Sequence, residues 1–279
     1  MRVLRYILPA ITIWLNVTAQ AAAPGADAII ARAYETKRVD DQISTLSFTF
    51  STPGETDRQA IYTMVWKNMH GEDGYDNKAI FFTEFPPEKK GIAYLGWLGT
   101  AEDTKESDEW IYLPELRMTR RIAHRDHTHA HDDDEFGNSL INRTHLDPRP
   151  PHMDDHQFIG EAALDGKMHY LVVSTPKHHG HGKEHMSNDT PAKTIHWIEQ
   201  ESYRTNRMQF LDAREKEILD MRISWIQMGD YWIWKSINAT NPDNQAKTVL
   251  EFDKIKINTG LKDRDFSKRA LEKGSGRFR

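Results

Sequence analysis

The spacing of hydrophobic residues along the chain changes once, from the period of a helix to the period of a strand. In residues 25–34, Ile29, Ile30, Ala33 and Tyr34 recur at i, i+1, i+4 and i+5, which places them on one side of a helix. From residue 43 onward, apolar and polar residues alternate, as in a strand with one buried face. The pattern predicts one short amphipathic helix followed by a β-rich body.

Twelve segments are expected to be strands, because turn sequences such as Pro53-Gly54, Asp73-Gly74 and Asp165-Gly166 separate them. They are Ser44–Ser51, Gln59–Trp66, Ala79–Phe85, Gly91–Leu98, Glu109–Leu113, Gln157–Ala163, His169–Ser174, Lys193–Glu199, Arg204–Leu211, Glu217–Gln227, Tyr231–Ala239 and Thr248–Ile257. Short strands joined by tight turns are typical of an antiparallel meander. A short helical tail is expected at Asp263–Lys273.

Two stretches without strand alternation, residues 124–156 and 177–190, hold eleven of the fourteen histidines. We expect both to be His-rich loops, since a long stretch without structure inside a compact domain is typically functional or disordered. The candidate metal ligands are His124, His127, His129, His131, His152, His156, His178, His179, His181 and His185.

The alternation of His127, His129 and His131 would let neighbouring imidazoles share one ion, if the chain is extended there. If it is helical, His127 and His131 meet at i, i+4 instead. Imidazole ligands favour Zn²⁺, Ni²⁺ or Cu²⁺. The alternative is a polar loop whose histidines are merely solvated.

The N-terminal residues 1–22 have the pattern of a cleaved export signal. Arg2 and Arg5 precede an apolar stretch, and small residues follow at A-x-A spacing near Ala21. A membrane anchor is the competing interpretation, but the apolar stretch is shorter than the ~20 residues that a span needs. We therefore expect residues 23–279 to form a single mature domain in the periplasm.

Composition narrows the possible functions. There is no cysteine, so a disulfide, thiolate chemistry and a lipidated N-terminal cysteine are excluded, and no stable membrane anchor is expected. Without residues 1–22 the chain has 35 basic and 42 acidic residues, which argues against a nucleic-acid partner. The common nucleophile, phosphate-binding, zinc-protease and dinucleotide motifs are absent, so we do not expect an enzyme.

The run from Trp110 to Ile122, WIYLPELRMTRRI, resembles a signature of the outer-membrane lipoprotein-sorting protein family, whose fold is that of the periplasmic carrier LolA. The pattern W-x-Y-x-P-x-x-x-x-x-R-R-I is met by Trp110, Tyr112 and Pro114, and by the double arginine and isoleucine at its end. Some members of this family are associated with RND-type exporters. The resemblance implies a strongly curved antiparallel sheet that forms an incomplete barrel, with helices over its open side and an apolar groove for an acyl chain.

Large apolar strand residues are the candidates for lining such a groove: Phe48, Phe50, Tyr62, Met64, Trp66, Tyr94, Trp97, Trp110 and Tyr112. The alternative is that they form an ordinary barrel core. Arg117, Arg120 and Arg121 end the signature; they could contact a lipid head group, or they could be a solvated edge that discourages aggregation.

These patterns favour a mainly β (α+β) periplasmic carrier or chaperone for a lipid, an acyl chain or a lipoprotein anchor. Its partner would be an inner-membrane exporter or an outer-membrane acceptor. The second hypothesis is a metal-binding accessory protein that uses the His-rich loops, and no other cofactor is expected. A hydrolase acting on lipid is the third.

Overall fold

The computed structural model describes residues 24–36, 39–99, 107–122, 136, 139–146, 149–177 and 191–278. Its strands are β1 (Asp41–Ser51), β2 (Arg58–Asn68), β3 (Tyr75–Phe85), β4 (Ala93–Gly99), β5 (Asp108–Leu113), β6 (Met118–Arg121), β7 (Asp154–Leu164), β8 (Lys167–Pro176), β9 (Lys193–Glu199), β10 (Thr205–Leu211), β11 (Glu217–Met228), β12 (Tyr231–Thr240) and β13 (Lys247–Ile257). Within these ranges, twelve strands coincide with the predicted ones. The thirteenth, β6, escaped prediction because its sequence MTRR has no buried residue and no alternation.

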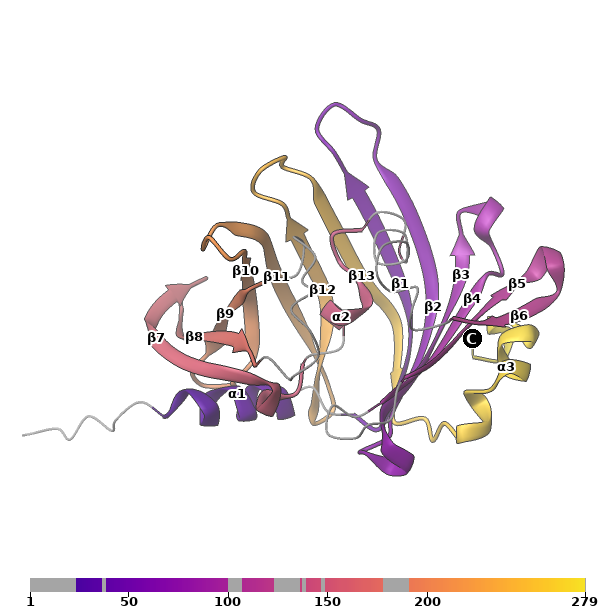
Figure 1. Cartoon of the computed structure of the whole chain (residues 1–279), viewed down its shortest axis with the longest axis horizontal. Coiled ribbons are helices and arrows are strands. Elements are labelled where there is room, and N and C mark those ends of the chain that lie inside the picture. The colour runs from indigo at the N-terminus through magenta and orange to yellow at the C-terminus, as the bar shows by residue number, and fades with distance from the viewer. Residues whose placement is uncertain are drawn as a thin grey trace, which may run out of the picture.

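All thirteen strands belong to one antiparallel sheet in the order β6-β5-β4-β3-β2-β1-β13-β12-β11-β10-β9-β8-β7. The chain starts in the middle, runs strand by strand to one edge at β6, crosses to the other edge at β7 and returns to the middle (Figure 1). The β1–β13 pair, with Phe48 opposite Leu250, joins the two halves. Because β6 and β7 do not pair, the curved sheet stays open, and the expected incomplete barrel is confirmed.

Three α-helices accompany the sheet in the described part of the chain: α1 (Ala26–Glu35), α2 (Arg143–Leu146) and α3 (Lys268–Lys273). The predicted amphipathic stripe of α1 is confirmed, since Ile29 and Ile30 are its buried residues. Among the helices described, none is long and apolar enough to cross a membrane.

Each face of the sheet has its own cover. Residues Phe136 and 139–146, which we call the strap, pack on the face that carries Phe48. The C-terminal residues 261–278, which we call the tail, pack on the opposite face over β2 to β5. We name the two surfaces the strap-covered face and the tail-covered face.

The position of α1 follows from the strand register. Ile198, which contacts α1, lies on the same face as His196 two residues earlier, and His196 pairs with Met208. Met208 packs against the apolar cluster of the strap-covered face. Helix α1 therefore covers the β7–β9 end of that same face.

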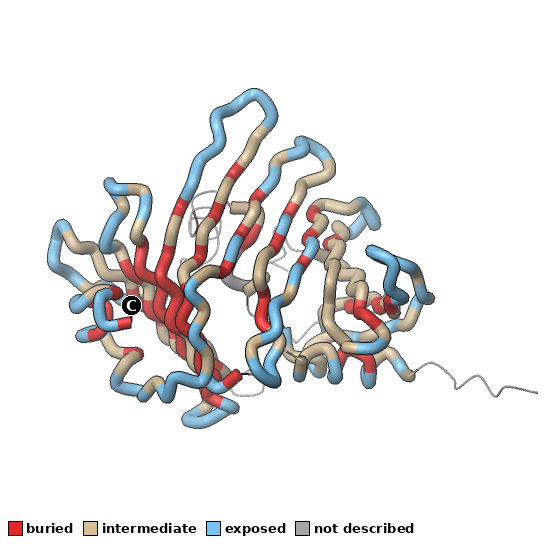
Figure 2. The backbone as a smooth tube through the Cα atoms, turned by 180° about the vertical axis from the view of Figure 1, so that it is seen from behind, coloured by how far each residue is buried: buried red, intermediate tan, exposed pale blue. Residues whose placement is uncertain are grey.

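Double coverage explains the burial pattern of the central strands. In β3, seven consecutive residues from Asn77 to Thr83 are buried, because the strap lies on one side and the tail on the other. The edge strand β7 alternates between intermediate and exposed residues along its whole length. Figure 2 shows the same contrast, with buried positions concentrated in the β1–β5 half of the sheet.

Asp41 fixes the point at which the tail leaves the sheet. Its carboxylate accepts hydrogen bonds from the backbone N–H groups of Thr259, Gly260 and Leu261 and from the Thr259 hydroxyl, at 2.7–3.0 Å. Burial alone would raise the pKa of Asp41, but these hydrogen bonds outweigh it and lower the pKa. Beyond this turn, Phe266 is fully buried and its carbonyl accepts a hydrogen bond from the Trp97 indole.

The expected His-rich loop at 124–156 needs a correction. Phe136 and Ile141 are buried on the sheet, and residues 154–156 already belong to β7. The sequence concealed this because the few apolar residues of the stretch are isolated among polar ones. Residues 1–22 and most of the expected loop at 177–190 lie outside the described residues.

Candidate functional site

The strap-covered face is a continuous apolar surface. Its central row runs across five strands through direct cross-strand partners, Ala60, Phe48, Leu250, Ile237 and Ile223. Two strap side chains, Phe136 and Ile141, complete this cluster of buried residues. A sheet face that is apolar over this width must be covered, and here the chain covers it with its own strap.

Phe136 is the centre of the contact. Its ring stacks on Phe48 with centroids 4.9 Å apart, and it meets Tyr62 and Phe81 edge-on at 5.2 and 5.5 Å. Offset-stacked and edge-to-face rings are the preferred aromatic geometries. Three rings from three adjacent strands thus form a pocket that a single phenylalanine from the strap fills, with only 3% of it exposed.

The rest of the strap combines a polar contact to the sheet with contacts inside the strap. The backbone N–H of Leu140 donates to the Thr248 hydroxyl on β13 at 3.0 Å. Within the strap, the N–H of Asn142 donates to His145 Nδ1 at 3.1 Å, and the His145 ring packs edge-on against Phe210 at 5.0 Å. Apolar packing of Phe136 and Ile141, together with the hydrogen bond from Leu140 to Thr248, holds the strap on the sheet.

Two histidines on this face have lowered pKa values. Burial lowers the pKa of His145 to about 4. Burial, with a smaller repulsion from His156, lowers the pKa of His196 to about 4. The strap-covered face therefore keeps both imidazoles uncharged at neutral pH, as an apolar binding surface requires.

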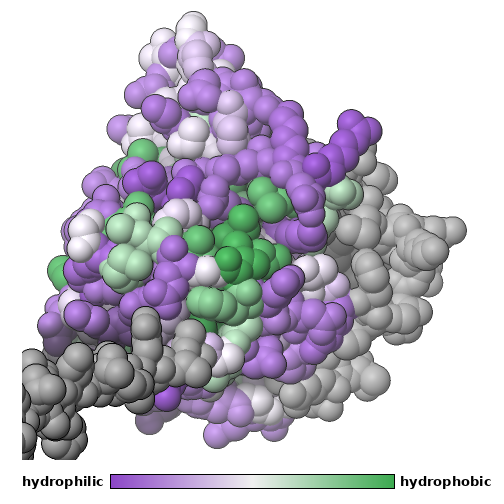
Figure 3. Space-filling model, turned by 90° about the vertical axis from the view of Figure 1, so that its left-hand side faces the viewer, coloured by the Kyte–Doolittle hydropathy of each residue, from purple (hydrophilic) through white to green (hydrophobic). Residues whose placement is uncertain are grey.

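The rim of the cluster contains large side chains that are only partly buried, among them Trp66, Tyr94 and Trp225. Beyond it, at the β7 end of the molecule, hydrophobic side chains gather at the surface within a hydrophilic surround (Figure 3). Ile159 on β7 and Met168 on β8 are large apolar residues of this end that are nearly half exposed.

The structure divides the nine predicted groove residues between the two faces. Six lie on the strap-covered face: Phe48, Phe50, Tyr62, Met64, Trp66 and Tyr94. The other three, Trp97, Trp110 and Tyr112, pack beneath the tail. Their assignment to one common groove is wrong, because the β4–β5 register pairs Leu95 with Trp110 and Ala93 with Tyr112 on the opposite face from Tyr94.

The predicted head-group arginines lie at the β6 edge, in the turn before it and on the strand itself. Arg117 follows a 3₁₀ turn in a left-handed conformation, and Arg121 forms an ion pair with Asp108 at 2.5 Å. No residue of β5 or β6 belongs to the apolar cluster of the strap-covered face among the described residues. The arginines therefore form a separate basic edge.

Of the predicted metal ligands, only His152 and His156 are described. Both ring nitrogens of His156 are engaged, one with the Ser174 hydroxyl and one with the Pro151 carbonyl, each at 2.8 Å. Within the described residues, no group of three or more histidines and carboxylates is arranged to hold a metal ion. His124, His127, His129, His131, His178, His179, His181 and His185 lie outside the described residues, so the metal hypothesis stays a prediction.

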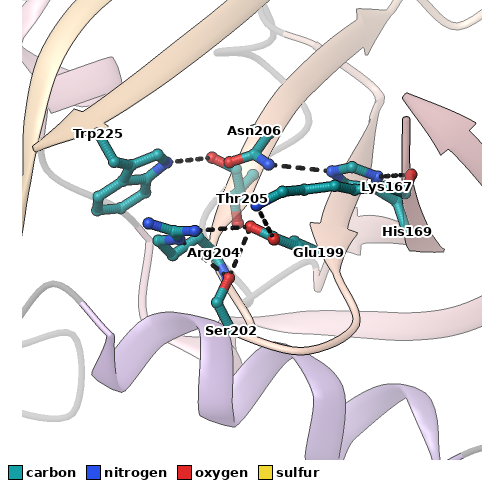
Figure 4. A network of polar contacts seen from close by, with 8 residues as sticks. All are labelled: Lys167, His169, Glu199, Ser202, Arg204, Thr205, Asn206 and Trp225. Atoms are coloured by element: carbon teal, nitrogen blue, oxygen red, sulfur yellow. Dashed lines mark hydrogen bonds and ion pairs between the residues drawn. The ribbon is translucent and has the colours of Figure 1, made fainter. Parts of the chain in front are cut away.

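A network of polar side chains joins β8, β9 and β10 near α1 (Figure 4). The Glu199 carboxylate accepts hydrogen bonds from Lys167, Ser202 and Arg204 at 2.5–2.9 Å. Burial alone would raise the pKa of Glu199, but these donors outweigh it and lower the pKa to about 2. A carboxylate saturated by two cations is a poor general base, so this network fixes the strand ends.

Sequence reasoning missed the strap residues Phe136, Leu140 and Ile141. The available signal was that these apolar residues interrupt an otherwise polar stretch without any period. Sequence reasoning also did not place Phe81, which lies on the strap-covered face, among the candidate site residues.

The open, curved antiparallel sheet is similar in fold to solved structures of LolA-like proteins. An outer-membrane lipoprotein-sorting protein domain from Vibrio parahaemolyticus matches with a TM-score of 0.72 at 20% identity, over 88% of this chain and 98% of that one. A DUF1329 family protein from Desulfovibrio piger gives 0.73 at 18%, over 88% and 97%. A LolA superfamily protein from Nitrosomonas europaea gives 0.61 at 17%, over 89% and 100%.

A family model described as "-like: Uncharacterized protein" matches residues 75–273, and the chain belongs to that family. No curated protein matches the sequence. The LolA-like fold that the sequence signature implied is confirmed.

Proposed function

We propose that this protein is a periplasmic carrier that binds an acyl chain, of a lipid or a lipoprotein, on its strap-covered face. The observation that supports this best is the pocket of Phe48, Tyr62 and Phe81 around Phe136. In this arrangement the strap occupies the place of the cargo, and the cargo binds by displacing it.

The physical argument rests on how the face is covered. A permanent core layer would be held by many hydrogen bonds and by regular structure. The strap instead has one four-residue helix, and it meets the sheet mainly through apolar side chains such as Phe136 and Ile141, with a hydrogen bond from the backbone of Leu140 to Thr248. An acyl chain offers the same apolar contact as the strap side chains, since hydrophobic association is non-directional and scales with the area removed from water.

The LolA-like relatives support the proposal at the level of fold. One of them is described as an outer-membrane lipoprotein-sorting protein domain, which is consistent with an acylated cargo. In this proposal, the protein exchanges its cargo with an inner-membrane exporter or an outer-membrane acceptor.

The test is binding of a fluorescent fatty acid to two variants. Each replaces a tryptophan with alanine, but the two tryptophans lie on opposite faces of the sheet. Trp66→Ala removes a partly buried indole from the strap-covered face, and Trp97→Ala removes one from the tail-covered face. We expect Trp66→Ala to lower the affinity at least fivefold and folded Trp97→Ala to keep the affinity of the parent protein. Equal affinities for both variants, or no binding by the parent, would refute the proposal.

Mass spectrometry of the protein purified from the periplasm without detergent gives an independent result. We expect an acylated molecule to co-purify, and to be lost when Phe48 is replaced by aspartate in a variant that still folds.

A further inference from the structure

The two turns at the β6 end of the sheet form one projecting surface. Residues 86–92 connect β3 to β4, and residues 114–117 connect β5 to β6. Both turns lie at the same end because β4 and β5 are antiparallel partners, with Ala93 opposite Tyr112. They also touch, since a Cβ added to Gly91 would lie 3.5 Å from Pro114 Cγ. We call this surface the tip; it is visible beside α3 in Figure 1.

The tip exposes large apolar side chains. Leu116 is 64% exposed, the highest value among the exposed large hydrophobic residues described. Met118, at the start of β6, is 39% exposed, and Phe85, which ends β3 directly before the first turn, is 37% exposed. Leu116 ends a 3₁₀ turn, and Arg117 then reverses the chain in a left-handed conformation, so this leucine stands at the apex. None of the three belongs to the apolar clusters in the described residues.

The same end of the molecule is strongly basic. Segments 86–92, 114–121 and 268–278 together contain nine basic and three acidic residues. Arg121 and Arg277 form ion pairs with Asp108 and Asp265 just outside these segments, which leaves an excess of four positive charges in a chain whose net charge is −5. The third segment belongs beside the other two, since Thr119 on β6 is hydrogen-bonded to Glu272 and the Ser275 hydroxyl to Glu84 near the top of β3. Lys90, Arg117 and Arg120 are exposed there.

We propose that the tip docks the protein reversibly on the surface of an anionic phospholipid bilayer, with Leu116, Met118 and Phe85 entering the interface. Exposed apolar side chains that protrude among cations match a bilayer with negative head groups and a hydrocarbon interior. An acidic protein surface would complement the cations but would give the exposed leucine at the apex no apolar partner. Charge complementarity and the apolar apex together favour the bilayer.

This surface is separate from the strap-covered face. Strands β5 and β6 contribute no residue to the apolar cluster under the strap, within the described part of the chain. Docking at the tip therefore leaves the strap-covered face accessible to cargo, and the two activities can be measured independently.

The experiment is flotation of the full mature chain with vesicles of phosphatidylcholine alone or with 30% phosphatidylglycerol. Each basic residue near an anionic surface contributes about fivefold to the partition coefficient. We expect binding to the anionic vesicles only, weakening as salt is raised. Leu116→Asp and the double variant Lys90→Glu/Arg120→Glu should each lose at least tenfold in affinity.

Matched controls lie elsewhere on the surface. Ile226→Asp changes an exposed isoleucine of β11 outside the tip, and Arg214→Glu/Lys247→Glu reverses two exposed charges, one in a turn and one at the start of β13. Both controls should bind vesicles within twofold of the parent, and all variants should retain fatty-acid binding. Vesicle binding that is unchanged in the tip variants overturns the proposal, as does a parent protein that ignores anionic vesicles or binds only an acidic protein.

Discussion

Replacing Phe136 with alanine should raise the affinity for an acyl chain while lowering the stability of the protein. The two effects share one cause. Phe136 fills the pocket of Phe48, Tyr62 and Phe81 with 3% of its surface exposed. If cargo must displace the strap, the apparent affinity is reduced by the free energy with which the strap closes.

The magnitude follows from the burial. Truncating a fully buried phenylalanine to alanine costs about 3–5 kcal/mol. Taking about 3 kcal/mol for loss of the closed strap, the apparent affinity rises by up to about a hundredfold, until the strap is open most of the time. The free energy of unfolding of the whole sheet falls by less than this amount. Once the strap is open, removing the Phe136 ring costs the folded sheet nothing more.

The assay is titration of a fluorescent fatty acid into the parent protein and into Phe136→Ala, with chemical denaturation of both. Phe266→Ala is the matched control, since it removes a fully buried phenylalanine from the tail-covered face. We expect the control to lose stability without gaining affinity. The reasoning is refuted if Phe136→Ala binds no more tightly than the parent and loses the full cost in global stability.

Three further predictions concern the strap and the histidines. Thr248→Val removes the hydroxyl that accepts a hydrogen bond from Leu140, so the closed strap should lose about 1 kcal/mol and the affinity for fatty acid should rise several-fold. Thr49→Val, on the opposite face of the sheet, should leave the affinity unchanged. A fatty-acid titration that gives equal affinities for the two variants would count against the role of this bond. His145 binds a proton more readily when unfolded, with a pKa near 6.5, than when folded, where it is about 4, so it stabilises the folded state above pH 6.5 and up to about 3 kcal/mol is lost as the pH falls from 6.5 to 4. Thermal unfolding of His145→Gln should accordingly depend less on pH over that window than the parent does, with His196 contributing the remainder; identical pH profiles would contradict this. The triple variant His127→Ala, His129→Ala and His131→Ala should bind Zn²⁺ or Ni²⁺ at least tenfold more weakly than the parent at pH 7.5 in calorimetry, and the parent's binding should weaken at pH 5.5; unchanged binding in the variant would remove these histidines as ligands.

Alternation along the chain was sufficient to predict the elements but not the faces. It shows that Phe48 and Phe50 share a side, and that Tyr62 and Met64 share a side. It does not show how β4 aligns with β5, which depends on turn lengths and on the register of each strand pair. For this reason the side of Trp110 could not be predicted. Alternation within β4, by contrast, already places Trp97 on the opposite face from Tyr94, three residues earlier.

β-bulges add a second limit of the same kind. The register shifts between Ile61 and Tyr62 and between Ser224 and Trp225, which leaves Glu84 on β3 and Lys235 on β12 as extra residues. Each extra residue breaks the alternation of faces on its own strand. A strict period of two therefore gives the wrong face after a bulge. In β12 the extra residue is Lys235, so Trp234 lies on the strap-covered face together with Ile237, three residues later.

The strap was beyond prediction for a different reason. Its fold is decided by contacts with strands that are distant in sequence, such as Phe136 with Phe48 and Leu140 with Thr248. No local period or turn signal indicates those contacts. The tail is intermediate: its helix was predicted from Asp263–Lys273, but its position on the face opposite the strap was not.

Photocrosslinking with a fatty acid that carries a diazirine at its end tests the central claim most directly. The claim is that an apolar cargo lies where the strap now lies. We predict that peptide mapping will place the adducts on β1, β2 and β13, around Phe48, Met64 and Leu250, and that excess unlabelled fatty acid will suppress them. Adducts confined to the tail-covered face around Trp97 and Trp110, or adducts that do not compete, would contradict the account.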